Sequence, residues 1–266
     1  MDHGHIEGGW TIERGNSPVV GTAIHDGGDL RRSCVPMMRL GASERLREED
    51  PFTALFIADF PTRVVVHRSR FEVDLNRPRE GVVYLSPEQS WGLKVWNERP
   101  DTETVEQSLA FHDAFYEDLR RTLSEIVQRH GRFVVIDVHS YNHRRDGPDA
   151  LPTPQERAPD INIGTFSMDR AKWAPVVDRF IDVLSQGRLN GRSLDVRENV
   201  SFQGKGEQTR FVHANFPDTG CAIAVEFKKI FMDEWTGMPD PPAIRQLRAV
   251  MASAVPVLED ALRGMG

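Results

Sequence analysis

The chain has 266 residues, a length that suits one α/β domain with insertions, and its composition is ordinary for a globular enzyme. Its 33 Lys and Arg residues against 40 Asp and Glu give a formal charge of −7, which argues against nucleic acid as a partner. Any anionic substrate must then be attracted by local arginines. Two isolated cysteines, Cys34 and Cys221, predict neither a disulfide framework nor a sulfur-rich metal site.

The sequence also carries an expectation about where the protein resides. Residues 1–10 lack a basic start followed by an apolar stretch, so no secretory signal is expected. Mean hydropathy is −0.45, and no apolar run approaches the length of a membrane span. We therefore expect a cytoplasmic protein with no membrane partner. The sequence does not indicate an oligomeric state.

The first half of the chain alternates between predicted strands and a helix. Short apolar runs at 19–24 and 63–66 predict two buried strands. An apolar stripe over 104–130 predicts a long helix with one buried face. A third apolar run, rich in Val and Ile, predicts a strand at 133–138.

The second half repeats this alternation. The Pro- and Gly-rich stretch 147–159 predicts a loop, and a helix is expected over 169–185. An apolar run at 222–227 predicts a fourth strand. A second loop at 233–242 leads into a final helix over 242–262, with proline near its start.

The predicted elements indicate an α/β fold in a single domain spanning 1–266. Each predicted strand is nearly continuously apolar, as expected for strands that are buried on both faces. Strands that alternate with helices favour a three-layer α/β/α sandwich with a mixed central sheet.

Polar clusters stand at the ends of the four predicted strands, and this is where chemistry is expected. Open α/β sheets bind ligands at the carboxyl ends of their strands, so these clusters are predicted to converge. Two histidines, a glutamate suited to act as a base and a pair of arginines are the inventory of a metal-assisted hydrolase. The clusters are His25-Asp26-Gly27-Gly28-Asp29, the segment from Ser69 to Arg77, Asp137-Val138-His139-Ser140, and Glu226.

Three of these positions have a physical rationale of their own. Asp137 and His139 are two residues apart on a strand, so the carboxylate can lie beside the imidazole and fix its tautomer. The glycines after His25 allow a close backbone approach to a ligand or metal. Glu226 follows an apolar run, and desolvation would raise its pKa toward that of a general base. The plainer alternatives are a strand end followed by a polar loop, a turn histidine, and a buried glutamate paired with arginine, an alternative that Lys228 and Lys229 keep open.

The segment before Pro78 offers a clamp for an anionic substrate. The planar guanidinium of Arg77 suits a carboxylate, and Asn76 adds a directional donor. Arg70 is a second candidate for this clamp. A structural ion pair between Arg77 and Asp74 is the alternative, and both arrangements can hold at once.

Taken together, these clusters resemble the N-formylglutamate amidohydrolase family, which is related to the zinc carboxypeptidases and aspartoacylases. The resemblance spans roughly residues 17–235 and rests on the joint order and spacing of the motifs. Its most distinctive piece is Ser-Arg-Phe-Glu-Val-Asp-Leu-Asn-Arg. The other motifs are Ile24-His25-Asp26-Gly27-Gly28, Glu49-Asp50-Pro51-Phe52-Thr53, Asp137-Val138-His139-Ser140, Gly206-Glu207-Gln208-Thr209-Arg210, Val225-Glu226-Phe227 and Phe231-Met232-Asp233-Glu234.

The resemblance implies a phosphorylase/hydrolase-like α/β/α fold and a single zinc ion held by His25, His139 and a carboxylate. Asp50 is the implied carboxylate because its Glu-Asp-Pro-Phe-Thr context is similar to an acidic segment of the family. Asp29 and Glu49 are the alternatives for this third ligand.

The resemblance also implies a reaction. Glu226 would take a proton from the water that attacks an amide carbonyl and return it to the departing amine. Arg77 and Asn76, with Arg70 or Arg210, would hold a carboxylate of a small-molecule substrate. The predicted function is zinc-dependent hydrolysis of an N-formyl or other N-acyl acidic amino acid, such as N-formyl-L-glutamate. A zinc carboxypeptidase or amidase acting on a small peptide, and a non-catalytic binder of an acidic ligand, are the alternatives.

Overall fold

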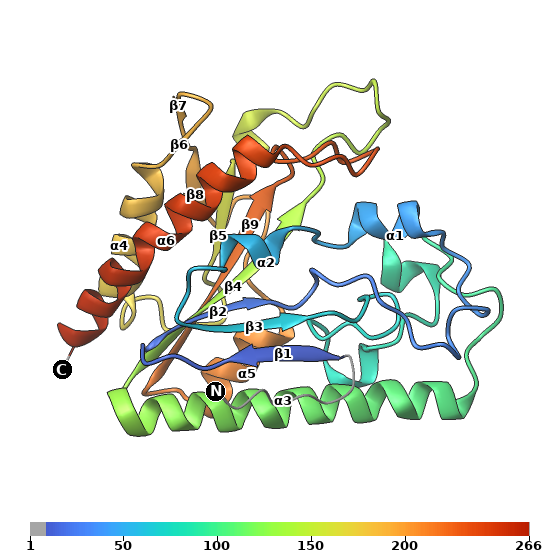
Figure 1. Cartoon of the computed structure of the whole chain (residues 1–266), viewed down its shortest axis with the longest axis horizontal. Helices are drawn as coiled ribbons and strands as arrows, with labels where there is room; N and C mark the ends of the chain where they lie inside the picture. Colours follow the sequence, from blue (N-terminus) through green and yellow to red (C-terminus); the bar gives the residue numbers. More distant parts are fainter. Residues whose placement is uncertain (1–8, 266) are drawn as a thin grey trace.

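The computed structural model describes residues 9–265 and is organised around one seven-stranded sheet (Figure 1). In spatial order the sheet contains β1 (Trp10–Glu13), β3 (Thr62–Val66), β2 (Val19–Ala23), β4 (Phe133–Tyr141), β9 (Gly220–Lys228), β5 (Ile161–Gly164) and β8 (Val196–Glu198). A separate two-stranded hairpin consists of β6 (Arg188–Leu189) and β7 (Arg192–Ser193).

The sheet is mixed, with parallel strands at its centre. β2 is parallel to both of its neighbours, β3 and β4, and β4 is parallel to β9. The pairs β1–β3 and β5–β9 are antiparallel, and the edge strand β8 is parallel to β5. The carboxyl ends of β2, β4 and β9 therefore lie at the same edge of the sheet.

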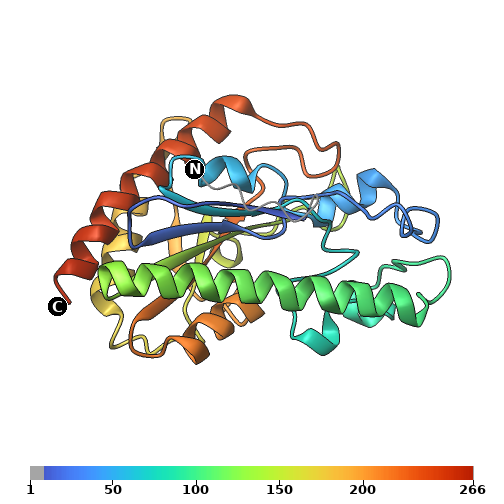
Figure 2. The same ribbon diagram turned by 60° about the horizontal axis from the view of Figure 1, so that its bottom comes forward.

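Helices cover both faces of this sheet (Figures 1 and 2). On one face lie α3 (Thr102–His130) and α5 (Glu207–Asn215), and on the other lie α2 (Thr53–Phe56), α4 (Ala174–Ser185) and α6 (Pro241–Arg263). The helix α1 (Ala42–Glu48) precedes α2 in the chain. Short 3-10 helices span Arg79–Gly81, Pro87–Ser90 and Gln155–Arg157.

The alternation of side chains along β4 explains both the core and the position of the polar site. Val134, Ile136 and Val138 belong to the apolar core shared with α2, α4 and α6. Phe133 and Val135 point the other way, into the core shared with α3. Successive residues of a strand face opposite sides, so Asp137 and His139 continue this second row beyond its apolar part. The strand thus presents a polar end on the face that α3 and α5 cover.

The predicted fold class is confirmed: the chain forms a three-layer α/β/α arrangement around a mixed sheet. All four predicted strands are present, but β4 and β9 are longer than predicted. They pair with each other along their whole length, from Phe133 with Gly220 to Tyr141 with Lys228. Asp137, His139 and Glu226 therefore lie inside strands, and the interpretation of Asp137-x-His139 as the start of a loop is wrong.

The long helices α3 and α6 match their predicted ranges to within two residues at each end. The predicted helix over 169–185 begins later, at Ala174, with Pro175 in its first turn. Residues 169–173 instead form turns that lead into it.

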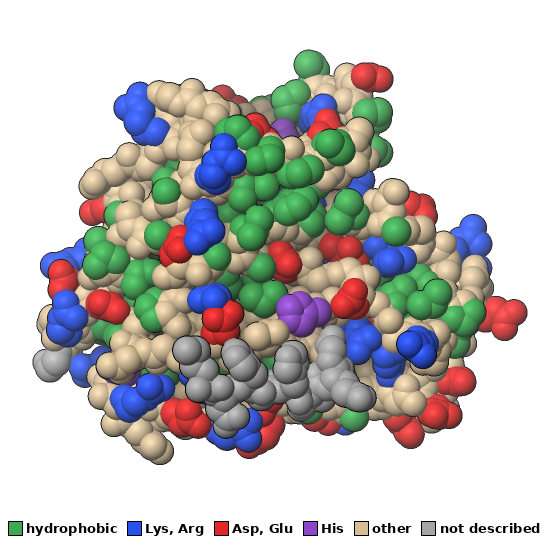
Figure 3. Space-filling model, viewed as in Figure 1, with side chains coloured by type: hydrophobic (Ala, Val, Ile, Leu, Met, Phe, Trp, Pro, Cys, Tyr) green, Lys and Arg blue, Asp and Glu red, His purple; other side chains and the backbone are tan. Residues whose placement is uncertain are grey.

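Surface features agree with the composition. No helix within residues 9–265 is long and apolar enough to span a bilayer. The face in Figure 3 carries acidic and basic side chains interspersed with apolar ones.

Candidate active site

The candidate site lies at the carboxyl ends of β2, β4 and β9, on the face covered by α5. His25 follows β2, and Asp137 and His139 belong to β4. Glu226 of β9 is the direct register partner of His139. Because partners in adjacent strands project to the same face, His139 and Glu226 face a common space.

Asp50 reaches this space from the turn between α1 and α2. Its N–H donates to the carbonyl oxygen of His25 at 2.9 Å, and Thr53 Oγ1 donates to the Asp50 carbonyl at 2.7 Å. Phe52 takes a left-handed conformation in the same turn, with φ of 71°. Hydrogen bonds on both sides of Asp50 thus hold its backbone beside His25.

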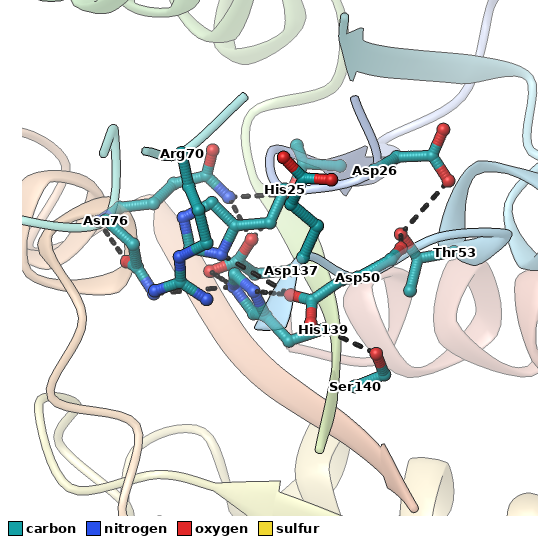
Figure 4. Close-up of polar contacts among 12 residues, drawn as sticks. His25, Asp26, Asp50, Thr53, Arg70, Asn76, Asp137, His139 and Ser140 are labelled. Atoms are coloured by element: carbon teal, nitrogen blue, oxygen red, sulfur yellow. Dashed lines mark hydrogen bonds and ion pairs between the residues drawn. The ribbon is translucent and has the colours of Figure 1, made fainter. Parts of the chain in front are cut away.

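Three atoms that could bind a metal converge at this point (Figure 4). Oδ2 of Asp50 lies 3.1 Å from Nδ1 of His139 and 3.4 Å from Nδ1 of His25. All three residues are buried, and their ligand atoms lie within 4.8 Å of one another. In the described part of the chain, this is the group of His, Cys, Asp and Glu side chains that meets the geometry of a metal site.

A second carboxylate stands behind each imidazole. Oδ1 of Asp74 lies 2.7 Å from Nε2 of His25, and Oδ2 of Asp137 lies 3.1 Å from Nε2 of His139. A carboxylate in that position accepts the Nε2 proton and leaves Nδ1 with a free lone pair. The hydrogen bond to Asp74 therefore holds His25 in the tautomer that a metal ligand at Nδ1 requires, and Asp137 lies close enough to Nε2 of His139 to orient that imidazole.

The donor set fits a divalent metal ion. Nδ1 of His25 is buried and has no hydrogen-bond partner among residues 9–265. The carboxylates of Asp50, Asp74 and Asp137 are all buried around the two imidazoles. Two histidines and one carboxylate are the protein ligands of zinc sites that keep a fourth position open. A cation there would offset the negative charge that these acids concentrate.

The electrostatics of the cluster follow from this crowding of acids and imidazoles. Burial disfavours the charged form of Asp50, but the neighbouring His139 and His25 hold the pKa of its carboxyl below the ordinary value. Burial likewise opposes charge on His139, yet Asp137 and Asp50 raise the pKa of its imidazole well above the usual range. The acids around His139 thus favour a positive charge at this point, which a proton on the imidazole supplies when no metal is bound.

Glu226 lines the same cavity and is partly buried. Burial raises the pKa of its carboxyl to about 7. Within residues 9–265 its side chain has no ion-pair partner, because Lys228 Nζ lies 3.3 Å from Asp160 and Lys229 Nζ donates to the Glu49 carbonyl. The alternative of a buried glutamate neutralised by an adjacent cation does not describe this structure.

A cavity of about 410 Å³ opens beside these residues. Its size is within the range of small-molecule sites. His25, Asp50, His139 and Glu226 line it, together with the segment 203–206.

The predicted carboxylate clamp borders this cavity. Arg77 lines it with a side chain that is 43% exposed, and its Nε lies 3.7 Å from Asp74. Asn76 also lines it, with Nδ2 3.5 Å from Nε2 of His139. Arg70 is more enclosed and donates to Asp74 at 2.9 Å. Both arginines thus pair with Asp74 and also line the cavity. Of the two, Arg77 is more exposed and lies farther from Asp74, so its guanidinium is more available to a substrate.

The structure does not bring Arg210 to the cavity. Its side chain pairs with Glu207 at 3.2 Å and borders a different hollow with Phe166 and His213. Arg210 directly follows Thr209, which lines the cavity, but the side chain of Arg210 borders the other hollow. The prediction of Arg210 as a substrate ligand is therefore corrected.

The alternative third ligands also lie elsewhere. Asp29 is exposed and outside the cluster. Glu49 is buried but accepts a hydrogen bond from Ser69. Gly27 has a different purpose from the one predicted, because a Cβ there would lie 2.1 Å from the backbone carbonyl of His67. This glycine allows the backbone to pass close beside the parallel segment at His67, and it does not serve an approach to a metal.

With this geometry established, the match to known proteins is informative. The family model described as N-formylglutamate amidohydrolase matches residues 17–232. The chain belongs to this family. All the residues that converge at the cavity lie within the matched range.

Solved structures agree with the fold of the N-formylglutamate amidohydrolase family. The chain is similar to an N-formylglutamate amidohydrolase from Ralstonia eutropha, with TM-score 0.74, 15% identity, and coverage of 97% of this chain and 100% of that one. It is also similar to a gene product of Agrobacterium tumefaciens, with TM-score 0.66, 16% identity, and coverage of 97% and 96%. A search among curated proteins finds no match.

Several residues that shape the site in this family member were not predicted from the sequence. Asp74 was expected only as a partner of Arg77, yet it holds His25. Its position between Val73 and Leu75 is a signal of burial that could have indicated this role. Gln208 of α5 donates to Asp137, and Lys229 anchors the backbone next to Asp50. These contacts join segments that are far apart in the sequence, so no local sequence pattern predicts them.

Proposed function

We propose that this protein is a zinc-dependent amidohydrolase that cleaves the amide of an N-formyl or other N-acyl acidic amino acid, such as N-formyl-L-glutamate. One observation carries the proposal: Nδ1 of His25, Nδ1 of His139 and Oδ2 of Asp50 converge in a cavity that Glu226 also lines. Membership of the N-formylglutamate amidohydrolase family supports the reaction type and the first substrate to test.

His25, Asp50 and His139 would hold the zinc ion. When bound, zinc supplies a Lewis acid that polarises the amide carbonyl and makes a water molecule more acidic. Asp74 and Asp137 would keep the two imidazoles oriented toward the ion.

Glu226 is proposed as the general base. Its carboxylate accepts a proton from the attacking water and returns that proton to the nitrogen of the departing amine. A pKa near neutrality suits a group that must both accept and donate in one cycle, and burial supplies that shift. The absence of an ion-pair partner for Glu226 within residues 9–265 leaves its carboxylate available to water and substrate.

Arg77 and Asn76 are proposed to bind a carboxylate of the substrate, with Arg70 beside them. Arg70 is largely occupied by Asp74, so its contribution is to balance that charge and support Arg77. Fixing the carboxylate at one end of the cavity orients the amide at the other, which lowers the entropic part of the barrier.

Hydrolysis of a panel of N-formyl and N-acetyl amino acids tests this function. We expect turnover of N-formyl-L-glutamate by the zinc-loaded protein and a loss of at least ~10²-fold in kcat in Glu226→Gln, with zinc still bound. Glu117→Gln is the matched control, since Glu117 is exposed on α3 and pairs with Arg120.

Other outcomes separate the alternatives. Cleavage of small peptides but not of N-acyl amino acids would indicate the peptidase. Binding of acidic ligands without any turnover would indicate the non-catalytic binder. Full activity in Glu226→Gln would show that Glu226 is not the base.

A further inference from the structure

Gln208, in the first turn of α5, is a fully buried polar residue with an unusual set of partners. Its Nε2 donates to Oδ1 of Asp137 at 2.5 Å and to Oγ1 of Thr22 at 2.6 Å. If the amide were turned over, its oxygen Oε1 would face a carboxylate oxygen, and two acceptors cannot form a hydrogen bond. The carboxylate of Asp137 therefore determines which way the amide of Gln208 points. The buried amide of Gln208 thus donates a hydrogen bond to the carboxylate of Asp137.

The two oxygens of Asp137 have different neighbours. Oδ1 accepts hydrogen bonds from Gln208 and, at 3.0 Å, from Oγ1 of Thr22. Oδ2 faces Nε2 of His139 at 3.1 Å. Donors from β2 and α5 therefore fix the rotation of the carboxylate, and the second oxygen is left for His139. A carboxylate without these donors could turn away from the imidazole.

The same turn of α5 also fixes the substrate side of the cavity. The N–H of Glu207 donates to the Asn76 carbonyl at 3.1 Å, and the N–H of Gln208 donates to Oδ1 of Asn76 at 3.4 Å. A Cβ at Gly206 would lie 2.2 Å from that Oδ1, so only glycine allows this approach. Gln208 thus contacts both Asp137, which lies behind His139, and Asn76, which lies beside His139.

We infer that Gln208 is a positioning residue that, through Asp137, holds His139 in the orientation needed to bind the metal. The inference rests on the proposed function, because it concerns the same zinc site. Gln208 touches neither metal nor substrate in this arrangement, and its effect passes through the carboxylate. Outer partners of this kind typically change metal affinity by about 10–100-fold when removed.

The test is zinc affinity, measured by competition with a chelator on metal-free protein, in wild type and Gln208→Met. Methionine is similar in length and removes only the polar end. We expect the zinc dissociation constant to rise by about 10–100-fold. Gln246→Met is the matched control: Gln246 is on α6, across the sheet, and binds Asn190, so its zinc affinity should equal wild type.

Thr22 provides a second route to the same answer. Thr22→Val removes the other donor to Oδ1 and should also weaken zinc binding, whereas Thr22→Ser keeps the hydroxyl and should restore it. This pair decides the question even if Gln208→Met fails to fold. If Gln208→Met and Thr22→Val both fold and bind zinc as tightly as wild type, the inference about Gln208 is wrong and the proposed function is unaffected. A wild-type protein that binds no zinc would instead overturn the proposed function.

Discussion

Each proposed zinc ligand is held by a further polar side chain, and these pairs span long distances in sequence. Asp74 holds His25 across 49 residues, and Ser140 donates to Oδ1 of Asp50 at 3.0 Å across 90. Such contacts restrict side-chain rotation before any metal arrives, so less entropy is lost on binding. The site is thereby organised by the protein itself.

Arg77 and Arg210 allow a direct test of the proposed carboxylate clamp. Arg77→Ala should raise KM for N-formyl-L-glutamate by about 10–100-fold, because a charge-assisted hydrogen bond is worth roughly 1.5–3 kcal/mol. Arg210→Ala should leave KM unchanged, since Arg210 borders another hollow. Steady-state kinetics on both variants provide the measurement. Equal effects of the two substitutions would contradict the clamp.

At this scale the sequence predicted the central residues and the carboxylate of Asp137 beside His139, but not the other supporting residues. His25, Asp50, His139 and Glu226 each belong to a short motif, and the structure brings the four to one cavity. Motifs record residues that are near in sequence. The role of Gln208 depends on contacts made after folding, whereas that of Asp74 was indicated in the sequence only by its place between Val73 and Leu75.

At the level of secondary structure, predictability followed the strength of the hydrophobic pattern. The long helices α3 and α6 and the central strands have buried apolar faces, and all were predicted. The helix α5 buries only Gln208, Thr209 and Val212, so it lacks an apolar stripe. The edge strand β8 reads Val-Arg-Glu and is only partly buried. Tertiary pairing decides such elements, and they were missed.

The docking of α5 onto β9 has a titratable contact. Nε2 of His213 accepts a hydrogen bond from the Ala222 N–H at 3.0 Å, and Nδ1 contacts Ser167 Oγ at 3.0 Å. Burial lowers the pKa of His213 to about 4, below the value near 6.5 of an unfolded histidine. Between these values the unfolded state binds more protons, so stability falls as the pH drops through this window.

This linkage predicts a difference between wild type and His213→Gln. Lowering the pH from 7.5 to 5 should reduce the free energy of unfolding of the wild type by roughly 1–2 kcal/mol more than that of the variant, because the variant lacks the titrating group. Urea unfolding at both pH values measures this. An identical pH effect in the two proteins would show that His213 does not titrate as the structure indicates.

For the molecule as a whole, the arrangement of layers explains why the site forms where it does. The sheet's parallel centre brings three strand ends to one edge, and the start of α5, the α1–α2 turn and neighbouring loops supply further walls. Net charge is −7, so attraction of an acidic substrate depends on the arginines at the cavity and not on the overall field. The fold class was predictable because these layers follow directly from alternating strands and helices.

The central claim is that His25, Asp50 and His139 bind one catalytic zinc ion, and zinc content measures it directly. Elemental analysis of the purified protein should find about one zinc per chain, as catalytic sites require. Asp50→Ala should lose the metal, whereas Asp29→Ala, which alters an exposed acid outside the cluster, should retain it. A wild-type protein without zinc after exposure to the metal, or Asp50→Ala with undiminished zinc, would contradict the account.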